Sequence, residues 1–575
     1  VKVMVDLARN RLAHERHVGS VGRELMEEAL AFYDSFLTKK PDDAVMREEI
    51  AKAYASAGDL REKLGRYEEA DKAYSAAIKL FEQLIVEDPG DHDHKRDLAN
   101  AHLQRSTVLQ VLRRDDEADE AFSKAKDLLK NLPPDDRTEL ERDWNMAVGF
   151  RNRAIAYQNK GNPAAAEELY LKADVLFEQL LKDNPQRHRI ASELAKTRID
   201  VAGVWSDDFT KANAMFQKAF DQLVPLAEAH PKAQAFQTEL GAAYINRSKF
   251  HNTHEKLAAA AQDSSAAVKI FHGLADEYPD VVDYRVYLAN AHRNHGVARQ
   301  KQKDWHVAAE AFRASTDIWS RLVKSDEKLT FYRKDLADVL RELALSLDSR
   351  FRAELAQKEP KVSDVILDAH AKEAEDAWDD AFAQFKKLRE LGAVDLSQIT
   401  KWVEADNRLM TFHMLQATRS WKTQPERAER HLQRRVAWQR EKLSSAPKDP
   451  GLKILVADAL LPLAMLYIDA QKPAEASRTI QEVTTLATPS WNRYPGAAGL
   501  LAKCIPVAEK TLKDKERDQA VKDYGERALA MLTDAVNAGF DNVAFLQKEP
   551  MLQPLRERPE FRAVLDKLIA SIEKK

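Results

Sequence analysis

The sequence is poor in cysteine and glycine, and each shortage excludes a class of protein. Cys504 is the only cysteine among 575 residues, so one chain cannot build a disulfide framework or a zinc site made of cysteines. Such a lone cysteine in an apolar helical run is usually a small buried hydrophobic residue. Glycine occurs only 17 times, whereas charged residues make up 32% of the chain. This composition favours long, solvated helices over a protein built from β-sheets.

The chain also lacks a strong charge of one sign and a long apolar run. Its net charge is −4 and its pI is near 6.5, so no basic excess points to nucleic acid as a partner. The most apolar window, residues 452–470, carries Lys453, Asp458 and Asp469. A bilayer span needs about 20 apolar residues, so this window looks too short and too charged to cross a membrane. We therefore predict no nucleic-acid partner and no membrane span in this chain.

The length and the first residue of the chain suggest its general organisation. A chain of 575 residues exceeds what one compact core supports, so we expect several domains or one extended array. The sequence begins at Val1 and shows no apolar core of a signal peptide. We expect a processed form or a fragment of a longer product.

The segment 64–89 has the pattern of a helix that packs closely on a second helix. Ala70 and Ala77 are small, and Tyr74 fills the space beside them. These residues share one face, because residues three and four positions apart are neighbours on a helix. A proline closes the segment, since proline does not continue a helix. The pattern resembles the second helix of a tetratricopeptide (TPR) repeat, in which residues 46–64 would form the first helix.

The same pattern recurs at intervals of 46 or 48 residues from Gly22 to Ala308, and then at intervals of 66, 54 and 48 residues as far as Ala476. In most copies a marker alanine is followed by a large apolar residue four positions later and by a small residue seven positions later. Ser264 breaks the rule for the large residue. The markers are Gly22, Ala70, Ala118, Ala166, Ala212, Ala260, Ala308, Ala374, Ala428 and Ala476. A period of this length indicates a solenoid. We predict an all-α, TPR-like α-solenoid superhelix of about ten helical hairpins with a C-terminal helical cap.

The regularity of the pattern divides the chain into five predicted segments. They are an N-terminal helical segment (1–45), a regular TPR array (46–345), an irregular insertion and helix (346–395), degenerate TPR hairpins (396–488) and C-terminal capping helices (489–575). The step from Ala308 to Ala374 exceeds the regular interval by 18 residues. We place the insertion between residues 348 and 368, where it either extends a helix or forms a protruding loop.

Three stretches resemble the TPR region that lies C-terminal to the catalytic domain in large planctomycete-type bacterial serine/threonine kinases. The stretches are LMEEALAFYDSFL followed by MREEIAKAYASAGDLREKLGRYEEADKAYSAAI, then YRVYLANAHRNHGVA, and the ending ALAMLTDAVNAGFDNVAFLQKEPMLQPLRERPEFRAVL. The match departs in the region 345–400. The resemblance implies an accessory region of a kinase: a sensor, a docking surface or an assembly surface. It also implies a place in the bacterial cytoplasm, or outside it if a membrane span precedes Val1.

The kinase domain itself is absent from the sequence. There is no Gly-x-Gly-x-x-Gly loop and no Asp-Phe-Gly motif. The stretch 96–98, Arg-Asp-Leu, is similar to the kinase catalytic loop, but that loop needs Asn five residues after its Asp, where this chain has His102. We therefore predict that the chain is not an enzyme.

We predict a non-catalytic protein–protein interaction scaffold, the docking or sensor region of a larger signalling protein of kinase type. The alternative is a structural assembly subunit of a large multiprotein complex, which its mass in solution would reveal; an oligomer is compatible with either. A second alternative is an enzyme within the segment 345–400, which would need a pocket with convergent polar groups. We expect no cofactor.

The histidines are numerous but show no recognised metal-binding spacing. His251 and His254 are three residues apart, as are His292 and His295, so either pair offers two ligands on one helix face. Neither pair has a further ligand at a known spacing. We expect solvated or hydrogen-bonded histidines and no metal site.

Amide side chains recur fourteen residues before the marker alanine. They are Gln104, Asn152, Asn246 and Asn294; Ser56 and Arg198 interrupt the series. We call the four amides the amide column. In TPR proteins the first helix of each hairpin lines the concave face, so by resemblance the amide column would line one groove. An amide offers a donor and an acceptor to a peptide backbone.

Basic residues accompany the amide column. Arg151 and Arg293 each precede an asparagine of the column, and Lys249 lies one turn after Asn246. We predict that these residues together hold an extended segment of a partner protein, with the cations favouring acidic groups. The alternative is that each amide is a hydrogen-bonding residue that packs adjacent helices.

Overall fold

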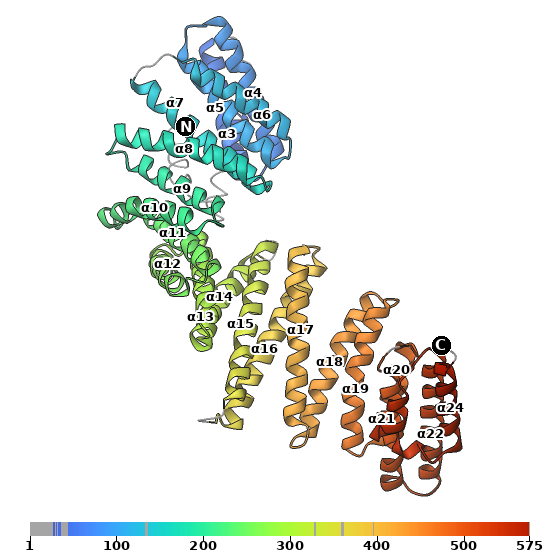
Figure 1. Ribbon diagram of the computed structural model, residues 1–575. Helices are drawn as coiled ribbons and strands as arrows, with labels where there is room; N and C mark the ends of the chain where they lie inside the picture. Colours follow the sequence, from blue (N-terminus) through green and yellow to red (C-terminus); the bar gives the residue numbers. More distant parts are fainter. Residues whose placement is uncertain are drawn as a thin grey trace. The chain divides into compact units, whose positions relative to one another are not determined.

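The computed structural model describes residues 27–28, 30–31, 33–35, 44–132, 136–326, 329–357, 361–394, 396–490 and 492–573. Every regular element within these residues is a helix (Figure 1), and they contain no strand. The all-α, TPR-like solenoid predicted from the sequence is thereby confirmed. The first marker, Gly22, lies outside the described residues.

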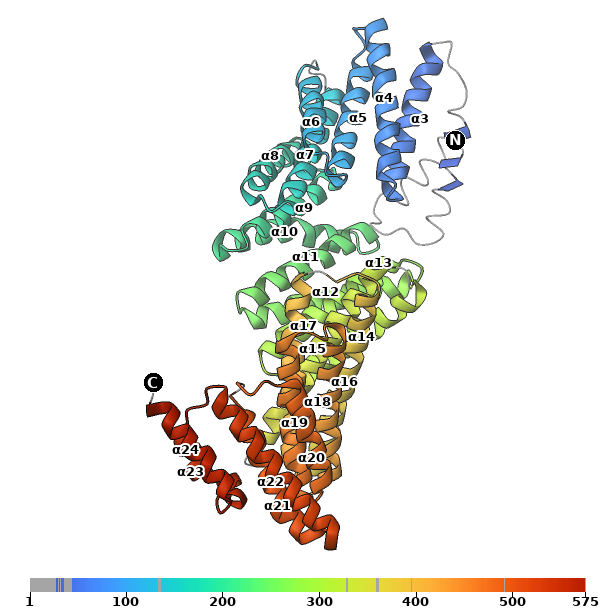
Figure 2. The same ribbon diagram turned by 90° about the vertical axis from the view of Figure 1, so that its right-hand side faces the viewer.

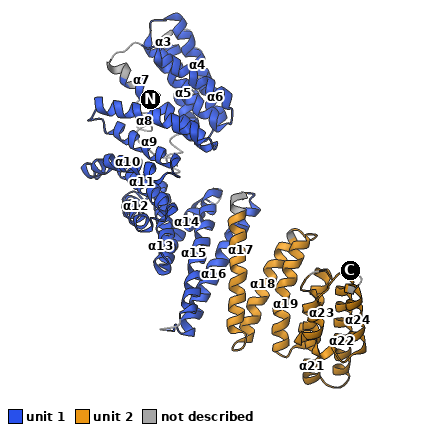
Figure 3. Ribbon diagram, in the orientation of Figure 1, with its two compact units in different colours: residues 1–392 blue, residues 393–575 orange. Residues whose placement is uncertain are grey.

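The chain divides into two compact units, residues 1–392 and residues 393–575 (Figure 3). In unit 1 the helices are α3 (Ala44–Lys63), α4 (Tyr67–Glu87), α5 (His92–Val111), α6 (Asp115–Lys130), α7 (Asp136–Asn159), α8 (Pro163–Asp183), α9 (His188–Val204), α10 (Phe209–Ala229), α11 (Gln234–Thr253), α12 (Leu257–Glu277), α13 (Val282–Lys301), α14 (Trp305–Ser325), α15 (Thr330–Ala356) and α16 (Asp364–Glu390). In unit 2 they are α17 (Leu396–Ser420), α18 (Pro425–Ser445), α19 (Pro450–Asp469), α20 (Pro473–Leu486), α21 (Tyr494–Thr511), α22 (Asp514–Asn537), α23 (Val543–Lys548), the 3-10 helix η1 (Pro550–Leu555) and α24 (Pro559–Glu573).

In unit 1, consecutive helices pair as hairpins, with the odd-numbered helix first and the even-numbered helix second (Figure 2). Each second helix also contacts the first helix of the next hairpin. The first helices contact one another in turn from α3 through α15, so they form one continuous layer. This layer, which we call the first-helix layer, carries the residues that the sequence predicts for binding.

The repeat register read from the sequence is confirmed by burial. All nine described markers are fully buried. The same holds for the small residues seven positions later in the first six hairpins, from Ala77 to Ser315. The aromatic rings four positions after the marker fill the space between two helices, and Tyr74, Tyr170 and Phe312 have no exposed surface. Small side chains therefore set the helix spacing, and large ones fill it.

The turns within the hairpins repeat as well. Five residues before the marker the backbone is left-handed, with φ of 76° at Gly65, 62° at Arg113 and 75° at Gly161. The next residue is the N-cap of the second helix, and in three hairpins its side chain accepts a hydrogen bond from a backbone N–H of that helix; these N-caps are Asn162, Asp208 and Asp304. In these hairpins, local chemistry thus contributes to ending the first helix or to starting the second one.

The predicted insertion lengthens the last hairpin of unit 1. Helices α15 and α16 each contain 27 residues, whereas the second helices α8, α10, α12 and α14 contain 21. The extra residues therefore extend both helices. Residues 358–360, at the centre of the predicted interruption, lie outside the described residues.

Unit 2 packs its helices around one apolar core. Within the described residues, α19 alone is long and apolar enough to cross a membrane, so length and composition do not exclude a span there, in contrast to the expectation. In the structure, α19 is packed into the core of unit 2. Its residues Val456, Leu460 and Leu463 are buried there, and α19 contacts α18, α20 and α21. At the C-terminal end, Gly539 ends α22 in a left-handed conformation, and η1 and α24 pack on α21 and α22.

Candidate binding face of unit 1

The structure places the amide column on four first helices: Gln104 on α5, Asn152 on α7, Asn246 on α11 and Asn294 on α13. Their surroundings differ. Gln104 and Asn246 are exposed and Asn152 is half-buried, whereas Asn294 is only 7% exposed. Equal positions in the repeat therefore do not give equal access to a ligand.

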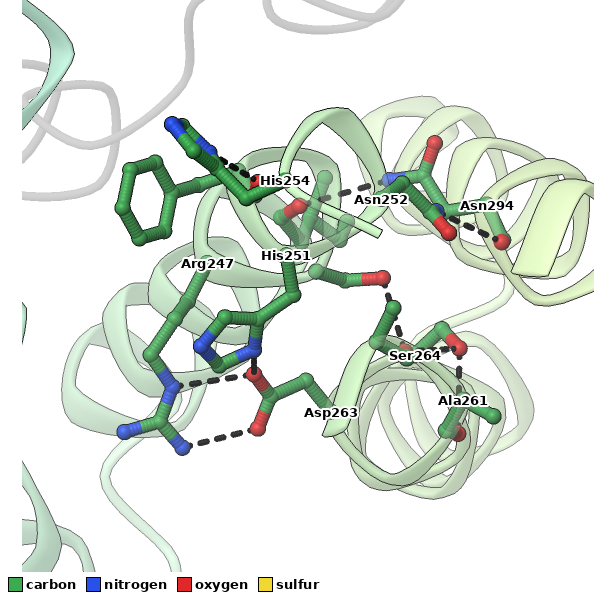
Figure 4. Close-up of polar contacts among 12 residues, drawn as sticks. Arg247, His251, Asn252, His254, Ala261, Asp263, Ser264 and Asn294 are labelled. Carbon is green, nitrogen blue, oxygen red and sulfur yellow. Dashed lines mark hydrogen bonds and ion pairs between the residues drawn. The ribbon is translucent and has the colours of Figure 1, made fainter. Parts of the chain in front are cut away.

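Asn294 forms hydrogen bonds within the array (Figure 4). Its Nδ2 donates to the backbone oxygen of Ile245 on α11 at 3.3 Å, and its own backbone oxygen accepts Nδ2 of Asn252 at 3.3 Å. Lys301 Nζ in turn donates to the backbone oxygen of Asn252 at 2.7 Å. These bonds join α11 to α13, so the amide nitrogen of Asn294 is used to pack two first helices.

The two arginines of the predicted site also bridge neighbouring first helices. On α7, Arg151 Nε lies 2.8 Å from Asp200, and its Nη1 lies 3.4 Å from Glu193, both on α9. On α13, Arg293 Nη1 lies 3.8 Å from Asp335 Oδ1 on α15. Asp335 follows Arg293 by 42 residues, and Glu193 follows Arg151 by the same number of residues. Both guanidinium groups therefore have carboxylate partners inside the array.

Lys249 differs from these arginines. Its side chain is exposed, and it has no carboxylate within ion-pair distance among the described residues. Protein atoms nevertheless crowd around it, and this desolvation, together with the positive charge of Arg293, lowers the pKa of Lys249 from its ordinary value. An anion near Nζ would offset both effects.

Asn246 and Lys249 line a cavity of about 330 Å³ in the first-helix layer. The cavity lies among α7, α9, α10 and α11. Its polar lining comes from Gln158, Asp200, Ser206, Asn246, Lys249, Thr253 and His254, and its apolar lining from Ile199, Ala202, Gly203, Phe216 and Phe250. The cavity thus combines a cation, a carboxylate, two amides, an imidazole and hydroxyl groups with an apolar wall.

A second series of amides, eight residues before the marker, escaped the sequence analysis. Its members are Gln110, Gln158, Asn252 and Gln300. Asn252 donates to the backbone oxygen of Asn294, and Gln300 Nε2 donates to that of Glu342 at 3.4 Å, in each case 42 residues further along. These amides join successive first helices. Counting eight instead of fourteen residues back from each marker would have revealed this series in the sequence.

Three of the four histidines in the predicted pairs, His251, His254 and His295, form bonds inside the array. His251 Nδ1 lies 3.0 Å from a carboxylate oxygen of Asp263, which also accepts two hydrogen bonds from Arg247 at 2.9 and 2.7 Å (Figure 4). Burial raises the pKa of Asp263, but the bonds from His251 and Arg247 outweigh it, so the pKa is lowered. His254 Nδ1 lies 3.0 Å from the backbone oxygen of Phe250.

A family profile for the tetratricopeptide repeat matches residues 51–84, which lie in α3, α4 and the turn between them. This segment is a TPR. The hairpin formed by α3 and α4 therefore has the sequence signature as well as the geometry of the repeat. No curated protein sequence matches the chain, so the kinase resemblance rests on the quoted sequence stretches alone.

Several solved helical-repeat structures are similar to this chain at low identity. BtubC from P. vanneervenii is 16% identical, with 44% of this chain and 92% of that chain covered and a TM-score of 0.36. The quorum sensor NprR from B. thuringiensis is 15% identical, with 74% and 98% covered and a TM-score of 0.32. Yeast Tom70 is 14% identical, with 92% and 95% covered and a TM-score of 0.22. Scores this low support no transfer of function.

Proposed function

We propose that the chain is a non-catalytic protein-interaction scaffold whose first-helix layer in unit 1 holds an extended segment of a partner protein. One observation carries the proposal. Asn246 and Lys249 are exposed on successive turns of α11 and line the same cavity. Gln104 and Asn152 extend the series of accessible amides toward the N-terminal hairpins.

The chemistry of these groups suits a peptide. Each amide both donates and accepts, as the N–H and C=O groups of an extended backbone require. Leaving a buried amide without partners costs about 1–3 kcal/mol, so an accessible position with water or a ligand is favourable. Lys249 adds a preference for an acidic group in the partner. Asn294 is left out of the proposed contacts because its nitrogen already bonds to α11.

The finer assignment is that this scaffold is the docking or sensor region of a kinase-type signalling protein; it rests on sequence resemblance. The alternative, a structural subunit of a large complex, predicts a solution mass well above 65.2 kDa for the purified chain. A measured mass of one chain, with retained peptide binding, would favour the scaffold.

The proposed function is tested with peptides selected from a random twelve-residue phage library on the full chain. The tightest peptide is synthesised with a fluorescent label, and its Kd is measured by anisotropy. We expect Asn152→Ala with Asn246→Ala to weaken binding about tenfold, about 1.4 kcal/mol, with a near-normal melting temperature.

Asn294→Ala is the matched control, because it removes the same group from the same repeat position. We expect it to lower the melting temperature, since the Ile245 oxygen and the α11–α13 contact lose a donor, and to leave the Kd unchanged. The groove assignment fails if the double variant binds the peptide like the wild type.

A further inference from the structure

We propose that the cavity lined by Asn246 and Lys249 is an anchor pocket for one aromatic side chain of the bound segment, with an acidic residue next to it. This inference rests on the proposed function and specifies the kind of partner segment that the first-helix layer binds. The cavity lies wholly within unit 1, among α7, α9, α10 and α11.

The size of the cavity suits a single large side chain. Its volume is about 330 Å³, at the lower end of the range of about 300–1,000 Å³ seen for ligand pockets. A benzene molecule binds in an apolar cavity of about 150 Å³. An aromatic side chain and part of its backbone therefore fit, whereas a dinucleotide or a haem does not.

One wall of the cavity is aromatic. The rings of Phe216 and Phe250 lie 5.3 Å apart between centroids, and the imidazole of His254 lies 4.5 Å from the ring of Phe250. Rings at such separations pack favourably edge-on or offset, beyond the gain from burying their area. A further ring from a partner would extend this cluster.

Gly203 leaves another part of the lining without a side chain. It lies near the end of α9 and is exposed, and a Cβ atom built there would meet only Gln158 Nε2, at 3.7 Å. A methyl group at this position thus has room, whereas a longer side chain would enter the cavity. The position allows the cavity to be filled without disturbing a packed interface.

The charges around the cavity favour an acidic neighbour for that ring. Asp200 is neutralised by Arg151 at 2.8 Å, and Arg293 lies 3.6 Å from Asp338. Lys249 is the cation of the lining without such a partner among the described residues. A carboxylate beside the anchor ring would meet Nζ, while a basic residue there would be repelled.

The experiment uses 19F NMR with the full chain and three probes. The first is acetyl-Ser-Asp-(4-fluoro-Phe)-Asp-Ser-amide, the second has Lys in place of both Asp, and the third is 4-fluorophenylacetate. Binding is read from broadening of the fluorine resonance. We expect the wild type to bind the Asp probe and not the Lys probe.

The variants separate the cavity from the general surface. Gly203→Leu fills the cavity, Thr253→Trp covers its rim, and Gly273→Leu is the control, because Gly273 is an exposed helical glycine with nothing within 4 Å of an added Cβ. We expect both filling variants to abolish broadening of the Asp probe, Lys249→Gln to weaken its binding about fivefold, and Gly273→Leu to bind normally. Circular dichroism confirms folding of each.

Binding of the Asp probe by both filling variants, or equal binding of the Asp and Lys probes, would overturn the anchor pocket. If the selected twelve-residue peptide still binds those variants, the proposed function stands without this pocket. If 4-fluorophenylacetate binds as tightly as the Asp probe, the occupant is a small aromatic acid and the peptide assignment is overturned. If the double variant Gln104→Ala with Asn152→Ala binds the selected peptide with unchanged Kd while the wild type binds the Asp probe, the proposed peptide contacts of the amide column are wrong. The anchor pocket is then still supported.

Discussion

At the scale of single residues, the buried His102 on α5 has a lowered pKa that makes stability depend on pH. It is 4% exposed, and its Nδ1 has no hydrogen-bond partner. Burial, with the positive charges of Lys124 and Arg105, lowers its pKa from 6.5 to about 4, against a small opposing effect of Glu120. The histidine is therefore neutral in the folded chain at pH 5 and charged in the unfolded chain.

Because the unfolded state binds the extra proton, His102 makes stability fall as the pH drops from about 6.5 to about 4. At 1.36 kcal/mol for each pH unit, the loss at pH 5 is about 2 kcal/mol. We expect His102→Gln to reduce the drop in melting temperature between pH 7.5 and pH 5. Thermal melting by circular dichroism at both pH values checks this, and an unchanged drop would contradict the assignment.

The amide column shows what sequence could and could not predict for a residue. The repeat period predicts that Asn246 and Asn294 share a position, and both lie on first helices. Their accessibility differs because Asn294 is buried where it bonds to the preceding first helix, α11, whereas Asn246 is exposed. The carboxylates that pair with Arg151 lie more than forty residues away. Contacts over that separation appear only once the hairpins are stacked.

At the scale of helix pairs, a glycine twelve residues before the marker leaves room for an aromatic ring of the second helix in two hairpins. Gly58 lies against Tyr74, and Gly296 lies against Phe312, and a Cβ atom at either glycine would lie 2.7 Å from a ring carbon. Both rings are fully buried. The same contact thus recurs five hairpins apart.

We expect Gly58→Ala and Gly296→Ala to destabilise the chain. Overpacking costs about 1–3 kcal/mol, which exceeds the gain of about 1 kcal/mol that alanine brings to a helix. Gly273→Ala, in α12 with open space around it, is expected to be neutral or stabilising. Chemical denaturation of the three variants measures the difference, and a stabilised Gly296→Ala variant would show that the ring moves aside.

The marker alanines give a second prediction for helix contacts. Ala166 has no exposed surface, while Ala164 on the same helix is exposed. We expect Ala166→Leu to lower the free energy of unfolding by about 1–3 kcal/mol, because added methyl groups force the two helices apart. Ala164→Leu is the control and should leave the melting curve almost unchanged. Equal curves for both variants would mean that the repeat register is wrong.

The hairpins themselves were predictable because their signals are local. Marker spacing and the closing proline lie within one repeat, and the hairpin predicted at 46–64 and 64–89 is close to the observed α3 (Ala44–Lys63) and α4 (Tyr67–Glu87). The sequence predicts an insertion between residues 348 and 368 but leaves its form open. Its outcome, two longer helices, depends on how α15 and α16 pack on each other, which no local pattern determines.

At the scale of the whole array, unit 1 is built by contacts between neighbours. Each hairpin touches the one before and the one after it, and the apolar clusters of unit 1 each involve only a few consecutive helices. The cavity arises in the same way, from residues of four helices that no single repeat contains. Repeat analysis predicted Asn246 and Lys249 individually, but it could not predict that they line a cavity with Gly203 and Phe216.

Nearest-neighbour stacking leads to a prediction about how damage spreads through unit 1. The stability of such arrays is close to a sum of repeat and interface contributions, so a local change should act locally. Gly58→Ala disturbs the α3–α4 contact, and Gly296→Ala disturbs the α13–α14 contact. We expect faster amide hydrogen exchange in α3–α5 for the first variant and in α12–α15 for the second, with α8–α10 unchanged in both. Exchange mass spectrometry on the full chain resolves these segments. If either variant accelerates exchange evenly across unit 1, the array unfolds as one cooperative body, and the nearest-neighbour account of its stability is wrong.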